Sequence, residues 1–135
     1  MANEATLIYE LGPAIPFTVA DGTGVAKGAI LKMADPMTAA LSDAQGDIVA
    51  GIAATEKIAN DGVTKLGVFR TGIFKVYASG SVTAGDPLMA DPAPISNYVA
   101  KAAINNEHVI GIALETATVG ESFLMELKPT TMELA

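Results

Sequence analysis

Short runs of apolar residues, separated by polar turns, follow one another along the whole chain. The turns combine Asp, Gly, Asn and Ser, the residues that favour tight reversals, and they recur about every 8–12 residues, a spacing typical of an all-β sandwich or barrel. No stretch has the pattern of an amphipathic helix longer than about two turns. We therefore expect about ten short strands, at 15–19, 29–33, 37–41, 48–54, 63–71, 73–78, 87–90, 97–104, 108–116 and 122–129.

The apolar run 48–54 is the one place where a helix competes with a strand, because alanine is frequent there. Gly51 lies at its centre, and a central glycine costs a helix about 1 kcal/mol relative to alanine. The flanking turns also leave only the length of a strand. Glycine inside a strand often marks a bulge or a close backbone approach. We interpret the run as a buried strand.

The same run is one copy of an internal repeat. Val-Ala-Gly-Ile-Ala at 49–53 returns as Val-Ile-Gly-Ile-Ala at 109–113, and a glycine corner precedes each copy while a turn and a closing strand follow it. A repeat has to be recognised before the fold is assigned. Two copies predict two similar halves, at 24–77 and 81–128, around one core. Ile52 and Ile112 would then occupy equivalent buried positions.

Taken together, these patterns predict an all-β fold, a compact β-sandwich or barrel built from two similar halves with an extended N-terminal arm. A chain of 135 residues is long enough for one domain with its own core. We expect the arm at 1–14, a single β domain at 15–129 and a flexible tail at 130–135.

Composition and net charge exclude several classes of function. The net charge of −7 opposes binding to nucleic acid, which requires a basic surface. The absence of cysteine excludes disulfides, thiolate nucleophiles and zinc–thiolate sites. No run reaches the roughly 20 apolar residues that span a bilayer, and the first residues do not resemble a signal peptide. We expect synthesis in the cytoplasm, with no membrane and no nucleic-acid partner.

The residue types that usually form catalytic or metal-binding sites show no arrangement typical of such a site in this sequence. His108 is the only histidine and stands at the start of an expected strand, where a structural role explains it. The aspartates lie in turns, where their side chains bond the local backbone, and no EF-hand or phosphate-binding loop is present. The sequence therefore predicts no catalytic, cofactor-binding or metal-binding residues, and no enzyme.

Two segments resemble the glycine corners of lipoyl and biotinyl carrier domains, namely 25–31 and 82–88. Lys32-Met33 resembles the tip at which a biotinyl lysine is modified, although Leu31 stands in place of the first methionine of that tip. A small carrier or binding module is therefore one alternative function.

A second resemblance covers residues 15–128. It consists of the corner 82–88, Gly-Ile-Ala-Leu-Glu at 111–115, Ala-Thr-Val-Gly-Glu at 117–121 and the strand 123–127. This pattern resembles the capsid decoration, or cement, proteins of tailed bacteriophages. The resemblance implies a structural virion protein that is made in the host cytoplasm, binds the major capsid protein outside the head as a homotrimer and stabilises the shell. Another virion part, in the tail or at the head–tail joint, is the alternative.

The N-terminal arm is the candidate contact with the capsid. Its segment Thr6, Leu7, Ile8, Tyr9, Glu10 and Leu11 has β-forming residues between a polar start and Gly12-Pro13. An extended arm can bind by adding a strand to the edge of another sheet. A strand of the chain's own sheet or a frayed terminus are the alternatives.

Overall fold

The computed structural model describes residues 4–44, 47–91, 97–101 and 108–131. In this part of the chain there are eleven strands and no helix, which confirms the predicted all-β fold. The strands are β1 (Thr6–Tyr9), β2 (Ile15–Thr18), β3 (Ile30–Asp35), β4 (Thr38–Leu41), β5 (Val49–Ala53), β6 (Lys65–Phe69), β7 (Gly72–Ala78), β8 (Pro87–Ala90), β9 (Tyr98–Lys101), β10 (His108–Ala113) and β11 (Ser122–Thr131).

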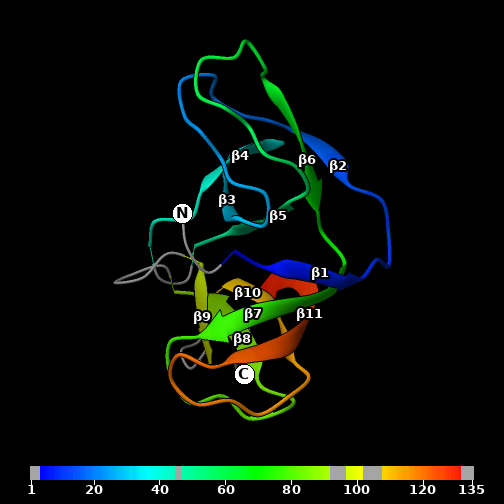
Figure 1. Ribbon diagram of the computed structural model, residues 1–135, viewed down its shortest axis with the longest axis vertical. Helices are drawn as coiled ribbons and strands as arrows, with labels where there is room; N and C mark the ends of the chain where they lie inside the picture. Colours follow the sequence, from blue (N-terminus) through cyan, green and yellow to red (C-terminus); the bar gives the residue numbers. More distant parts are fainter. Residues whose placement is uncertain (1–3, 45–46, 92–96, 102–107, 132–135) are drawn as a thin grey trace.

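The strands form two five-stranded barrels, one above the other in Figure 1. The first barrel closes in the order β2-β4-β3-β5-β6. The second runs β7-β11-β10-β8-β9 and closes through a pairing of β7 with β9. In each barrel the closing contact is a parallel pair, Thr18 with Thr38 and Tyr77 with Tyr98. Strand β1 lies outside the second barrel and pairs with β7.

The pairing register repeats between the barrels. Leu31 faces Gly51 across β3 and β5, and Leu88 faces Gly111 across β8 and β10. Strand β7, which the sequence placed in the first half, pairs within the second barrel as the counterpart of β2. The division into arm, domain and tail remains a prediction.

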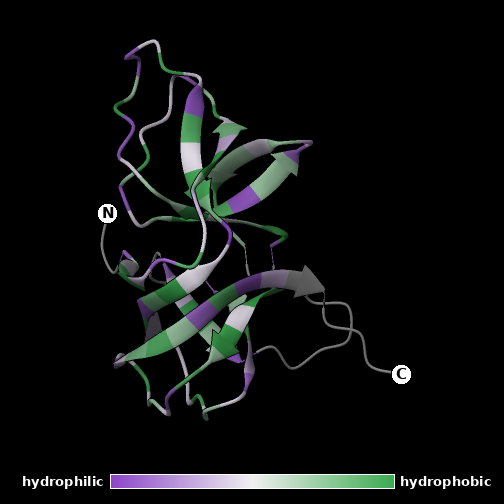
Figure 2. Cartoon of the chain, turned by 90° about the vertical axis from the view of Figure 1, so that its right-hand side faces the viewer, coloured by the Kyte–Doolittle hydropathy of each residue, from purple (hydrophilic) through white to green (hydrophobic). Residues whose placement is uncertain are grey.

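Each barrel has its own hydrophobic core. Hydrophobic and polar residues alternate along strands in Figure 2, and buried positions alternate with more exposed ones along β7, so that one face of the strand is directed inward. The second core also takes in Ile30, Val49 and Ile52 of the first barrel, and β5 contacts both β10 and β11. The sequence predicted one shared core, whereas the structure has two cores that meet at β5, because a closed barrel encloses its own inward-facing residues.

Ile52 and Ile112 occupy equivalent strand positions, but they differ in burial. Ile52 is fully buried, whereas Ile112 is half-buried, so the prediction of burial is wrong for Ile112. The reason is the order of the barrels, since Ile52 packs with the core of the second barrel. In the described part of the chain, no third barrel lies against Ile112.

A buried hydrogen bond joins the barrels. Ile30 donates its backbone N–H to the side-chain oxygen of Asn97, at 3.0 Å. In the repeat, the counterpart of Ile30 is Pro87, which has no N–H. The counterpart of Asn97 is Met37, which has no oxygen or nitrogen acceptor in its side chain. Asn97 and Met37 both have positive φ, 65° and 49°. The repeat therefore makes this hydrogen bond only once, at the junction of the two barrels, where the buried N–H of Ile30 needs an acceptor.

Replacing Asn97 with glycine is expected to destabilise the protein by about 1–3 kcal/mol, because the Ile30 N–H is left buried without this acceptor. Glycine tolerates the positive φ, so backbone strain does not add to the loss. Met37→Gly is the matched control and is expected to be neutral or slightly stabilising. Urea unfolding at pH 7 measures both. Equal effects of the two variants would show that the junction does not depend on this bond.

Candidate functional site

The segment that the sequence singles out begins as an edge strand. Thr6 to Tyr9 form β1, with Thr6 opposite Lys75 and Leu7 opposite Phe74 on β7. Just before the strand, the Ala5 N–H donates to the carbonyl oxygen of Gly28 in the first barrel, at 2.8 Å. Of the alternatives left open by the sequence, the structure shows a strand of the chain's own sheet.

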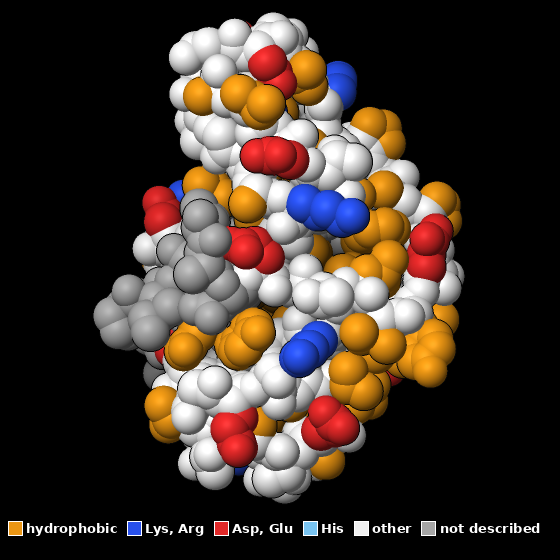
Figure 3. Space-filling model, in the orientation of Figure 1, with side chains coloured by type: hydrophobic (Ala, Val, Ile, Leu, Met, Phe, Trp, Pro, Cys, Tyr) orange, Lys and Arg blue, Asp and Glu red, His pale blue; other side chains and the backbone are white. Residues whose placement is uncertain are grey.

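Apolar side chains are exposed on β1 and on its connection to β2. Leu7 packs half-buried against the second core, whereas Thr6 and Glu10 are exposed. From β1 to the first residue of β2, the large exposed apolar residues are Ile8 (42%), Tyr9 (63%), Leu11 (58%) and Ile15 (38%). We call these four residues the β1 patch. Figure 3 shows hydrophobic side chains gathered along the right-hand side, where Figure 1 places this connection. Clustered exposed apolar residues are typical of a contact surface.

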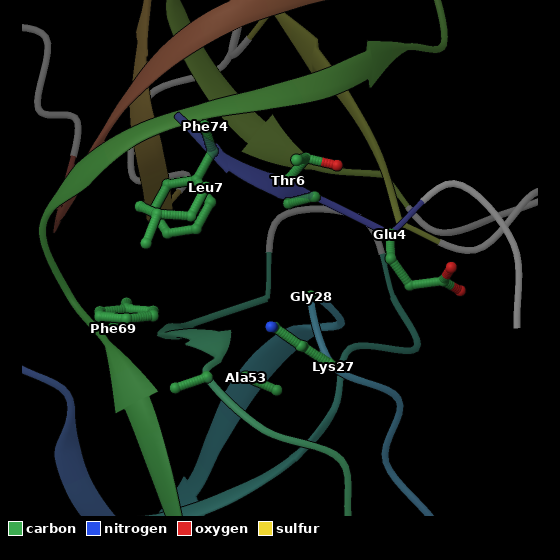
Figure 4. A pocket seen from close by; sticks show the side chains of 10 residues that line it. Glu4, Thr6, Leu7, Lys27, Gly28, Ala53, Phe69 and Phe74 are labelled. Atoms are coloured by element: carbon green, nitrogen blue, oxygen red, sulfur yellow. The ribbon is translucent and has the colours of Figure 1, made fainter. Parts of the chain in front are cut away.

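A cleft lies between β1 and the first barrel. Its volume is about 510 Å³, and Figure 4 shows the side chains around it. The lining residues are Glu4, Ala5, Thr6, Leu7, Lys27, Gly28, Ala53, Ala54, Phe69 and Phe74. The sequence gave no signal for this cleft, because it forms where an N-terminal strand of the second sheet passes the corner of the first barrel.

A buried charge cluster lies at the far end of the first barrel. The Lys57 side chain is fully buried, and its ammonium donates to carboxylate oxygens of Asp21 (3.1 Å) and Asp61 (2.9 Å). It also donates to the backbone carbonyl oxygens of Asp21 and Ile58. The cluster ties the turn before β6 to the turn after β2.

The cluster shifts the pKa values of its members. Burial is the largest influence on the pKa of Lys57 and lowers it, but hydrogen bonds and charges of Asp61 and Asp21 outweigh burial, so the pKa lies above its ordinary value of 10.5. The hydrogen bond from Lys57 lowers the pKa of Asp61 below 3.8, and the backbone N–H groups of Val63 and Ile58 act in the same direction.

The second barrel builds the same turn without a lysine. Ala117 takes the position of Lys57, and the carboxylate of Glu121 accepts hydrogen bonds from the backbone and hydroxyl of Thr118. The Thr118 backbone N–H lowers the pKa of Glu121 below 4.5. The carboxylate at the 61/121 position therefore closes a turn in both barrels, and Lys57 strengthens the first one. This is structural chemistry, in line with the turn role predicted for the aspartates.

The other residues considered from sequence lie apart from the β1 patch. His108 is half-buried at the start of β10. Lys32 lies within β3 and not at a hairpin tip, and its ammonium contacts Asp43 at 2.8 Å. Among the described residues, no three His, Cys, Asp or Glu side chains gather into a possible metal site. In the same residues, no helix has the length and hydropathy needed to cross a membrane.

The structure is thus an all-β tandem barrel with an exposed apolar edge. Comparison with known proteins gives the family. Residues 10–127 match the model of the phage cement proteins, and the chain belongs to this family. It is a capsid-associated structural component of the virion, on the exterior of the phage head, as the resemblance implied.

Among solved structures, the chain resembles the crystal structure of the N base of the head fibre gp8.5 of bacteriophage phi29. The TM-score is 0.58 with 17% sequence identity, over 89% of this chain and 98% of that chain. At this identity the likeness concerns the fold. No curated protein matches the chain.

Proposed function

We propose that the chain stabilises the head without catalysis, by binding the major capsid protein through the segment Thr6–Leu11. The observation that carries the proposal is the exposure of Ile8 and Tyr9 on an edge strand and of Leu11 just after it. Family membership supplies the capsid as the partner, and the β1 patch is where apolar contact area is available.

The chemistry of the patch suits such a contact. Tyrosine and large aliphatic side chains bury much area on binding, and a few central residues carry most of the energy of an interface. Because β1 is already paired with β7, the patch is held in place before binding. A pre-ordered surface loses less conformational entropy on docking than an arm that orders at that moment.

Two further parts of the proposal concern mechanism and assembly. Non-catalytic action is supported by the family and by the structural use of the charges around Lys57. The proposal that the chain assembles as a homotrimer rests on the resemblance. A trimer would also compensate for the small size of the β1 patch. Four apolar side chains form a small contact, and linking three such contacts raises occupancy through effective concentration.

The variant Tyr9→Asp with Leu11→Asp is expected to fold normally and to lose head binding. Each substitution places a charge in the contact, and loss of a central apolar residue costs about tenfold or more in Kd. Co-sedimentation with heads assembled without this protein measures binding, and urea unfolding checks the fold. Val119→Asp, at a residue that is 68% exposed on the second barrel, is the matched control. Equal binding of both variants would contradict the proposed contact.

A further inference from the structure

Strand β1 has one edge that faces the cleft. Thr6 pairs with Lys75 on β7, while the neighbouring Ala5 N–H points the other way, to the carbonyl oxygen of Gly28. Backbone groups alternate in direction along an extended strand. The N–H and C=O of Leu7 therefore point to the same side as those of Ala5, into the cleft. An edge with such groups is a template for another strand.

Part of the cleft wall beside this edge is apolar. Leu7, Phe69 and Phe74 form one side, and the Phe69 and Phe74 rings are 5.9 Å apart between centroids. Ala53 lies on the opposite side of the cleft from Leu7 and Phe74 in Figure 4, and Ala54 also lines the cleft. A volume of about 510 Å³ lies within the range of about 300–1,000 Å³ typical of ligand sites. The cleft can take a large apolar side chain together with a stretch of main chain.

Two charged side chains, Lys27 and Glu4, also line the cleft, and they point away from each other in Figure 4. Figure 4 shows the Lys27 side chain directed into the cleft. Among the residues that the structure describes, Lys27 makes no ion pair or hydrogen bond through its ammonium. An ammonium beside apolar walls favours a carboxylate next to an apolar group.

The internal repeat shows that these features are not required by the barrel itself. The counterpart of Lys27 is Ala84, and the counterpart of Ala54 is the larger Leu114, yet the second barrel forms the same glycine corner. Both the cation and the small residue that leaves the cleft open belong only to the barrel beside β1. The corner would fold without either of them.

We propose that this cleft binds an extended segment of the capsid protein, which adds as a strand to the outer edge of β1. In the bound state the segment places an apolar side chain against Phe69 and Phe74 and a carboxylate against Lys27. Main-chain hydrogen bonds to Leu7 provide affinity, and the side-chain contacts provide specificity. This inference rests on the proposed function and assigns a second part of the contact, next to the β1 patch.

Ala54→Phe tests the cleft, because a phenyl ring at this position fills it. The expected result is a Kd for undecorated heads raised about tenfold or more, with the urea midpoint preserved. Leu114→Phe, at the equivalent position of the second barrel, is expected to bind as wild type. If Ala54→Phe does not fold, Lys27→Glu replaces it, with Lys128→Glu as the charge control. Wild-type binding by Ala54→Phe, or by Lys27→Glu in its place, overturns the proposal.

Hydrogen exchange adds a readout that is specific to strand addition. In wild-type protein bound to heads, the Leu7 amide is expected to become protected, whereas the Ala5 amide is bonded to Gly28 in both states. Unchanged exchange at Leu7 overturns strand addition. Failure of the broader function has a different signature, since wild-type protein would then not bind heads, or the Tyr9 and Leu11 variant would bind normally.

Discussion

Gly51→Ala is expected to destabilise the protein by about 3 kcal/mol or more. A Cβ atom at this position would overlap the carbonyl oxygen of Phe69 and lie 2.7 Å from Cγ1 of Val68. The φ of Gly51 is +147°, a conformation that side chains with a Cβ rarely adopt. Because β5 lies between β3 and β6 in the closed barrel, neither neighbour can move away without opening the barrel.

Substitutions at two other glycines distinguish the steric overlap of the Cβ atom from the strain of the positive φ. A Cβ at Gly111 would overlap the carbonyl oxygen of Glu126 in the same way, so Gly111→Ala is expected to be comparably destabilising. Gly120 has a φ of +82° with open space around it, so Gly120→Ala is expected to cost only about 1–2 kcal/mol. Urea unfolding measures all three. A loss at Gly51 no larger than at Gly120 would contradict the close strand approach in the first barrel.

Lys57→Met is expected to lower the urea midpoint at pH 7 strongly. The substitution keeps most of the apolar stem but removes the buried cation, and it leaves Asp21 and Asp61 near each other without it. Lys75→Met, at an exposed residue of β7, is the control and is expected to change the midpoint little. Equal midpoints for the two variants would mean that the cluster does not support the barrel.

The same pair of variants gives a pH dependence with a defined sign. The lowered pKa of Asp61 means that its contribution to stability is present above pH 3.8 and is lost as the pH falls through the lower folded value. The raised pKa of Lys57 means that its contribution is present below pH 10.5 and is lost as the pH rises through the higher folded value. The gap between wild type and Lys57→Met should therefore be widest near neutral pH and narrow at both extremes.

Local patterns were enough to predict ten of the eleven strands and the repeat, whereas a strand at Thr6–Tyr9 was only one alternative for the arm. Gly51 and Gly111 carry the same requirement in both copies, because a neighbouring carbonyl oxygen approaches each one. The turn aspartates were also readable, since Asp61 bonds backbone groups only two and three positions away. Both features depend on short-range geometry, which residue type and spacing describe well.

The remaining features depend on contacts between distant parts of the chain. Lys57 meets Asp21 across 36 positions, and Ile30 meets Asn97 across 67. No spacing rule marks such pairs. The strand that pairs with β1 could likewise not be predicted. The residues of an exposed edge strand do not indicate whether it pairs with its own sheet or with the sheet of another protein. The cleft beside Lys27 follows from that placement and could not be predicted without it.

Cryo-electron microscopy of heads incubated with the wild-type protein tests the central claim most directly. The account predicts density on the outer surface of the shell, in clusters of three copies, with Tyr9 and Leu11 against the major capsid protein and a capsid segment beside β1. Heads without added density would contradict a role in binding the capsid. Density that contacts the shell through the second barrel, with the β1 patch facing solvent, would contradict the proposed contact surface.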